Sequence, residues 1–164
     1  MHVYFVNYDD IKKQINEKID EVRKISQENI WFYSSDYSDN LATDHLTKFC
    51  ENFIPFFAGK ENVFMEIRSK SLNVASLLAL SPTPNVEIAF SLNPDEVIKK
   101  YENKTPSLDL RIAAINKLIN AGWKVGIRFI PLLEIENYKE IYRDFLEYVT
   151  QKIDFTQVSS VFMG

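Results

Sequence analysis

The sequence predicts an α/β protein built as an incomplete parallel (β/α) barrel of about five βα units and a final strand. Short β-branched and aromatic runs alternate with helical patterns along all 164 residues, and polar side chains occupy every second position of three neighbouring runs. Strict strand–helix alternation requires parallel strands joined by right-handed crossovers. Because a complete eight-unit barrel needs about 250 residues, we expect residues 1–164 to form one partial barrel domain.

Six runs have the composition of strands, and they cover residues 3–6, 30–33, 63–68, 86–91, 124–130 and 158–162. Helices are expected between them from apolar residues at helical spacing, over 11–22, 46–57, 72–80, 108–119 and 138–149. Gly59 ends the second helix, and Gly122 is placed for a left-handed residue after the helix of 108–119. Another helix is predicted to start at Asn93 as N-cap, with Pro94 in the first helical position.

Polar residues share one face of three consecutive predicted strands. Strands covered by helices on both faces should be almost continuously apolar, so this face is expected to line a barrel interior, the lumen. The alternative is a buried ion-pair network that only fills the lumen. Lys70 and Ser91 continue these polar faces at the strand ends. The lumen-lining candidates are Asp36, Glu66, Arg68, Glu87 and Arg128.

Hydroxyl-bearing residues and one cation stand at the carboxyl ends of the strands, where ligands bind in barrels and in open α/β sheets. Such a rim suits a ligand with a carboxylate, a ribose or a phosphate, because an ammonium group binds anions and hydroxyls supply hydrogen bonds. For Ser34, Ser35, Ser69 and Asn93, ordinary loop and capping roles are the favoured alternative. The rim comprises Ser34, Ser35, Asp36, Ser38, Ser69, Lys70, Ser91, Asn93 and Pro131.

Composition excludes several classes of protein. The net charge of −4 gives no support for nucleic-acid binding, and a single cysteine allows no disulfide within the chain. No apolar run approaches the roughly 20 residues of a membrane span, so we expect a cytoplasmic protein without membrane contact. With four glycines and no phosphate-binding loop, a dinucleotide-binding fingerprint is ruled out.

Six segments, taken in order and spacing, resemble the spore photoproduct lyase family of radical S-adenosylmethionine proteins. They are DYSDNLATDH (36–45), EIRSKSLNV (66–74), FSLNP (90–94), TPS (105–107), AGWKVGIRF (121–129) and FMG (162–164). The resemblance implies a partial barrel in which a [4Fe–4S] cluster reductively cleaves S-adenosylmethionine (AdoMet), and in the lyase the radical acts on a thymine dimer in DNA. By position, Ser38, Lys70 and Ser91 are implied to contact AdoMet, with Lys70 meeting its carboxylate.

The chain departs from the family pattern at three places. The family's cluster is held by three cysteines after the first barrel strand, whereas this chain is expected to start at the second strand and contains only Cys50. Asp36 stands where the lyase has its hydrogen-donating cysteine, and Ile130 replaces the aspartate of an Arg-Phe-Asp-Pro motif. These departures predict a relative of the lyase that is truncated or lacks the cluster.

Two further hypotheses remain open from the sequence. One is a non-catalytic binding or interaction module derived from the barrel. For this module and for the truncated relative alike, an open parallel barrel edge predicts self-association or pairing with another chain. The other is an unrelated phosphate-binding enzyme that uses Asp36, Asp44 and His45. Cys50 lies among apolar residues and is expected to be a small core hydrophobe.

Overall fold

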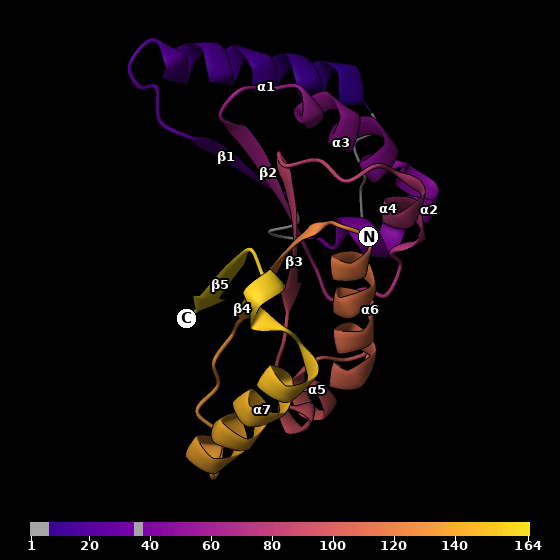
Figure 1. Ribbon diagram of the computed structural model, residues 1–164, viewed down its shortest axis with the longest axis vertical. Coiled ribbons are helices and arrows are strands. Elements are labelled where there is room, and N and C mark those ends of the chain that lie inside the picture. The colour runs from indigo at the N-terminus through magenta and orange to yellow at the C-terminus, as the bar shows by residue number, and fades with distance from the viewer. Residues whose placement is uncertain (1–6, 35–37) are drawn as a thin grey trace.

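The computed structural model describes residues 7–34 and 38–164, which form five parallel strands in the order β1-β2-β3-β4-β5. The sheet curls into a half-barrel, with α2, α4 and α6 on its convex side (Figure 1). This confirms the predicted incomplete barrel. The predicted strand at 3–6 lies outside the described residues. The strands are β1 (Ile30–Ser34), β2 (Val63–Ser69), β3 (Val86–Ser91), β4 (Lys124–Phe129) and β5 (Ser160–Met163).

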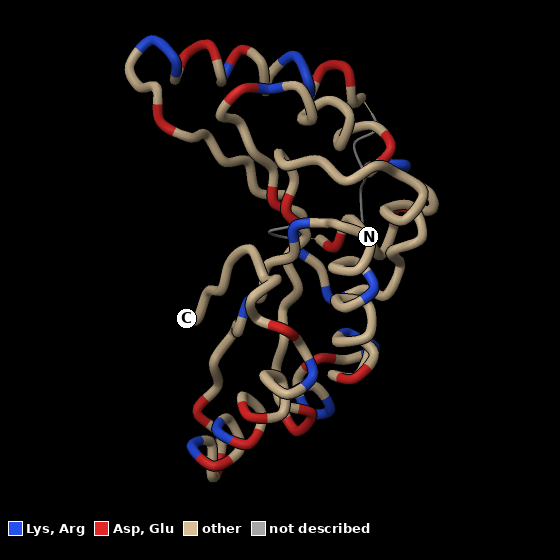
Figure 2. Tube along the Cα trace, viewed as in Figure 1, with Lys and Arg blue, Asp and Glu red and all other residues tan. Residues whose placement is uncertain are grey.

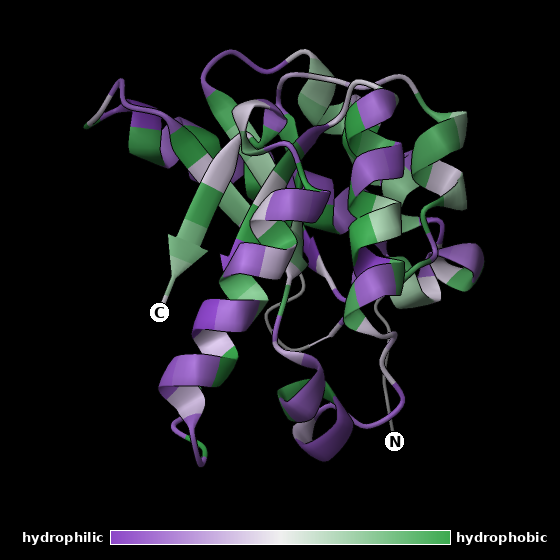
Figure 3. Cartoon of the chain, turned by 60° about the horizontal axis from the view of Figure 1, so that its bottom comes forward, coloured by the Kyte–Doolittle hydropathy of each residue, from purple (hydrophilic) through white to green (hydrophobic). Residues whose placement is uncertain are grey.

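Helices follow the strands as expected, and they turn apolar side chains toward the sheet. Figure 3 shows hydrophilic and hydrophobic residues alternating around the helices, with mainly hydrophobic strands between them. The fully buried core includes Phe57, Ile67, Ile88, Ile115 and Ile127. The helices are α1 (Tyr8–Arg23), α2 (Asn40–Thr47), α3 (Phe49–Ala58), α4 (Ala75–Ala79), α5 (Asp95–Tyr101), α6 (Leu108–Asn120), α7 (Tyr138–Lys152) and the 3₁₀ helix η1 (Phe155–Gln157).

Two local predictions were wrong. The helix expected over 46–57 is divided into α2 and α3 at Lys48, whose backbone is left-handed with φ of 55°. The Asp44 carboxylate stabilises this junction by accepting a hydrogen bond of 2.8 Å from the Cys50 backbone nitrogen. Asn93 is not an N-cap, because Pro94 precedes α5 and the Asn93 amide bonds elsewhere.

The other element predictions hold with small shifts at the ends. The helix expected over 72–80 is limited to α4, β4 stops at Phe129, and β5 starts and ends slightly later than predicted. Gly122 has a φ of 86°, which confirms the left-handed position after α6. Among the described residues, no helix is long and apolar enough to cross a membrane.

Strand register brings the lumen-facing polar residues together. Glu66 pairs with Glu87 across β2 and β3, and Ser91 pairs with Arg128 across β3 and β4. Because side chains alternate between the two faces of a strand, these residues meet on the concave face of the sheet. The predicted polar lumen is therefore present.

Candidate functional site

The loop after β1 and the end of β2 are joined by Asp39, a residue that the sequence patterns did not single out. Its side chain caps α2 by accepting a hydrogen bond of 3.1 Å from the Ala42 backbone nitrogen. The same carboxylate accepts bonds from the Ser69 hydroxyl at 2.8 Å and the Lys70 backbone nitrogen at 2.9 Å. Asp39 therefore fixes the backbone of the rim beside Ser38, whose own side chain is exposed.

The Lys70 ammonium group forms an ion pair with Glu102, the residue that follows α5. Lys70 Nζ lies 2.9 Å from Glu102 Oε1, and the Asn93 amide donates to the same oxygen at 2.9 Å. The second carboxylate oxygen, Oε2, accepts from Arg111 at 2.5 Å. Burial alone would raise the pKa of Glu102, but donation from Lys70, Arg111 and Asn93 outweighs it and lowers the pKa to about 2. The carboxylate is thus ionised and held by several donors.

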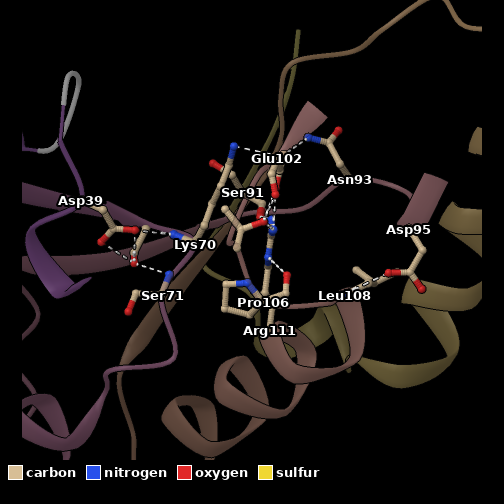
Figure 4. Close-up of polar contacts among 12 residues, drawn as sticks. Asp39, Lys70, Ser71, Ser91, Asn93, Asp95, Glu102, Pro106, Leu108 and Arg111 are labelled. Carbon is tan, nitrogen blue, oxygen red and sulfur yellow. Dashed lines mark hydrogen bonds and ion pairs between the residues drawn. The ribbon is translucent and has the colours of Figure 1, made fainter. Parts of the chain in front are cut away.

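Arg111 connects this ion pair to the end of β3. Its side chain is fully buried, and its Nη1 donates to the Ser91 carbonyl oxygen at 3.0 Å (Figure 4). Nε donates to the Pro106 carbonyl oxygen at 3.0 Å, and Nη2 also bonds the Thr105 hydroxyl at 2.8 Å. The pair of Arg111 and Glu102 therefore links Ser91 and Lys70, two of the three residues expected to contact AdoMet.

A second polar network lies in the lumen. One Arg128 nitrogen, Nη2, contacts Glu66 at 2.6 Å and Glu87 at 2.5 Å, and all three side chains are at most 7% exposed. The Ser160 hydroxyl adds bonds of 2.7 Å to Glu87 and 2.8 Å to Arg128. Burial would lower the pKa of Arg128, but the two carboxylates raise it, so the guanidinium stays charged. The buried ion-pair network anticipated as one alternative is present.

Arg68 occupies the exposed side of this network. Its Nη2 lies 2.8 Å from Glu66 Oε1, and its side chain is 30% exposed. A cavity of about 510 Å³ adjoins the network, and it is lined by Tyr33, Glu66, Arg68, Arg128, Ser160, Val161 and Phe162. A neighbouring cavity of about 320 Å³ adds Trp31 and Phe64, whose rings stack with centroids 5.0 Å apart. The lumen thus combines one accessible guanidinium with aromatic surfaces.

The acid–base candidates do not form a site among the described residues. Asp44 is buried and bound to the Cys50 backbone, and His45 is exposed in the last turn of α2. Asp36 lies outside the described residues. Cys50 has no exposed surface, which confirms its predicted place in the core. Its burial, and to a lesser extent the nearby Asp44 carboxylate, raises the pKa of the thiol.

The residues present do not fit an iron–sulfur cluster. Three thiolates are needed in the family's motif, and the full sequence offers one cysteine, which is buried in the core. Within 7–34 and 38–164, no group of three His, Cys, Asp or Glu side chains could hold a metal ion. Lys70 and the rim hydroxyls, in contrast, are the donors that a carboxylate and polar groups of AdoMet require.

The family profile described as spore photoproduct lyase matches residues 1–163 of the chain. The chain belongs to the spore photoproduct lyase family. Spore photoproduct lyase of Clostridium acetobutylicum is 29% identical over 90% of this chain, and the Geobacillus sp. protein is 27% identical over 96%. These matches cover 43% and 45% of the relatives, so the chain spans less than half of their length.

Solved spore photoproduct lyases share the curled fold. A cysteine-to-alanine mutant superposes with a TM-score of 0.86 at 27% identity, covering 95% of this chain and 46% of that protein. A double mutant with bound AdoMet and dinucleoside spore photoproduct gives the same TM-score, identity and coverage. The half-barrel architecture and the relationship to a radical AdoMet repair family, both expected from the motifs, are thereby confirmed.

Proposed function

We propose that this chain forms the AdoMet-binding wall of a radical AdoMet protein in the spore photoproduct lyase family. The observation that carries the proposal is the placement of Lys70 at the carboxyl end of β2, ordered by Glu102 and yet 32% exposed. An ammonium group that makes one ion pair retains two protons for a further acceptor. A related structure holds AdoMet on the same fold, which supports this ligand.

The three rim residues that the resemblance implies as AdoMet contacts each have a definite part in the proposal. Lys70 binds the carboxylate of the methionine moiety, and Ser38 and Ser91 donate hydrogen bonds to its other polar groups. Ser38 is exposed beside the fixed carboxylate of Asp39, and Ser91 ends β3 next to Arg111. AdoMet supplies radical chemistry only with a reduced cluster, and residues 1–164, with one cysteine, do not provide the thiolates for that cluster.

The lumen is the proposed place for the second ligand, a dinucleoside spore photoproduct such as solved relatives hold. Trp31 and Tyr33 are 41% and 57% exposed and line the lumen cavities, where aromatic rings can stack on bases. Recognition by stacking does not require a basic surface. Acidic and basic residues alternate along α1 and are mixed on α7 (Figure 2), so extended contact with a DNA backbone is not part of the proposal.

Isothermal titration of the purified chain with AdoMet tests the proposal. We expect saturable binding that Lys70→Ala weakens at least tenfold, because the ligand carboxylate loses its charged partner. Lys99→Ala is the matched control, since Lys99 is exposed on α5 and outside the ion-pair cluster of Lys70, Glu102 and Arg111. A second titration with dinucleoside spore photoproduct should quench Trp31 fluorescence, and Trp31→Phe should abolish that change. Absence of AdoMet binding at millimolar ligand, or equal binding by Lys70→Ala, refutes the proposal.

A further inference from the structure

We infer that Glu102 is a positioning residue for AdoMet binding, acting through Lys70, and that the Arg111–Glu102 pair fixes Lys70 relative to Ser91. This inference rests on the proposed function and extends it to residues that do not touch the ligand. It starts from the position of Glu102, which lies directly after α5 and 32 residues beyond Lys70 in the sequence.

Glu102 is more tightly constrained than the lysine that it contacts. Its side chain is 6% exposed, whereas that of Lys70 is 32% exposed. Arg111 and Asn93 donate to the carboxylate from α6 and from the end of β3, at 2.5 Å and 2.9 Å. A flexible four-carbon side chain that ends on a fixed carboxylate loses most of its rotamer freedom before a ligand arrives.

The same pair also reaches the backbone at the end of β3. Arg111 uses Nη2 for Glu102 and Nη1 for the Ser91 carbonyl oxygen, so one planar guanidinium sets the spacing of both contacts. Arg111 has no exposed surface and therefore is not available to a ligand in the rim. Lys70, just after β2, and Ser91, at the end of β3, are thus connected through the side chains of Glu102 and Arg111 (Figure 4).

A competing role for Glu102 predicts the opposite change in AdoMet affinity when the carboxylate is removed. If the carboxylate merely neutralises Lys70 and competes with the ligand, its removal should strengthen AdoMet binding. If it positions the ammonium group, removal should weaken binding, because the ligand must then order the lysine itself. The two roles are separated by the sign of the change in Kd.

The binding experiment compares Glu102→Gln, Lys70→Met and the double variant, with Glu96→Gln on the preceding helix α5 as a control for loss of a negative charge. Glu96 is exposed and outside the ion-pair cluster. We expect Glu102→Gln to weaken AdoMet binding five- to tenfold in the wild-type background and less than twofold beside Lys70→Met. Equal weakening in both backgrounds would show a merely structural role and overturn the inference, as would tighter binding by Glu102→Gln.

A ligand-free measurement separates this inference from the proposed function. Acetylation by acetic anhydride, followed by mass spectrometry, reports the reactivity of Lys70 relative to Lys99. We expect Glu102→Gln to raise that ratio at least threefold, and Glu96→Gln to leave it unchanged. An unchanged ratio in Glu102→Gln overturns the inference, whereas failure of the wild-type chain to bind AdoMet overturns the proposed function alone.

A second substitution, Glu102→Asp, tests the inference in case Glu102→Gln does not fold. Glu102→Asp keeps a negative charge for the buried Arg111 but withdraws the carboxylate from Lys70 by one methylene group. It is expected to retain a cooperative unfolding transition while still raising Lys70 acetylation and weakening AdoMet binding. Wild-type reactivity and affinity in Glu102→Asp would contradict the inference.

Discussion

Gly126 is the residue through which the lumen network can be tested most directly. It lies on the lumen face of β4, and a Cβ atom added there would stand 2.6 Å from Glu87 Oε1 and 2.8 Å from both Arg128 Nη1 and Ser160 Oγ. Ordinary contact begins at 3.4 Å, so these groups would have to move by about 0.6–0.8 Å. The three atoms belong to the buried hydrogen-bonded network, so moving any one of them disturbs its bonds to the others.

The energetic consequence follows from two opposing effects. Replacing glycine by alanine stabilises a protein by about 0.4–1 kcal/mol when the site accepts the side chain, because the unfolded chain loses freedom. Overpacking costs about 1–3 kcal/mol, and disturbing a buried ion pair adds to it. We therefore expect Gly126→Ala to lower the free energy of unfolding by about 2 kcal/mol. The shift is read as a lower urea midpoint with an unchanged m-value, followed by circular dichroism.

Gly59→Ala is the control for this substitution. Gly59 has nothing within 4 Å of an added Cβ, and its φ of −103° suits any residue. This variant is expected to match or exceed the wild-type stability by up to about 1 kcal/mol. If the two variants unfold within about 0.5 kcal/mol of each other, the lumen network is not the close-packed arrangement described above, and the reasoning from it is refuted.

Two further predictions concern the rim and the end of α6. The pKa of Glu102 is lowered from 4.5 to about 2, so its contribution is complete above pH 4.5 and is lost as the pH falls through about 2. The difference in free energy of unfolding between wild type and Glu102→Gln, measured by urea titration, should accordingly shrink between pH 5 and pH 2, by at most about 3 kcal/mol. A difference that stays constant over this range would contradict the assigned ion pairs. Gly122→Ala should destabilise by about 1 kcal/mol, because a side chain at φ of 86° is strained. Thermal unfolding measures this effect, and an unchanged Tm would exclude strain at Gly122.

Alternation along strands made the lumen network predictable. The polar residues of the three predicted strands fall on alternating positions, and these include Glu66, Glu87 and Arg128. Parallel strands in register bring such positions to one face of the sheet. The sequence could not decide between a ligand-binding lumen and a self-contained ion-pair network. That choice depends on side-chain distances across three strands, which only the three-dimensional arrangement provides.

The rim network was missed because its members come from separate elements. Glu102 follows a short helix, and no local pattern connects it with Lys70. Arg111 did carry a signal, since it lies one turn from Leu108 and Ile115 on the apolar face of α6. An arginine on such a face is either a packing defect or a buried ion-pair partner, and the latter is the case here. The division between α2 and α3 escaped prediction because it depends on the contact of Asp44 with the Cys50 backbone.

The two networks differ in what they leave for a ligand. In the lumen, Glu66, Glu87 and Arg128 are nearly inaccessible and satisfy one another, so a ligand anion could bind them only by breaking buried pairs. At the rim, Lys70 keeps about a third of its side chain exposed while its partner Glu102 is buried. The anticipated ion-pair network therefore crosses the concave face from β2 to β4, whereas the proposed binding site lies at Lys70 and Glu102, just after β2 and α5. An anionic group of the ligand belongs at the rim, and the lumen suits uncharged rings beside Arg68.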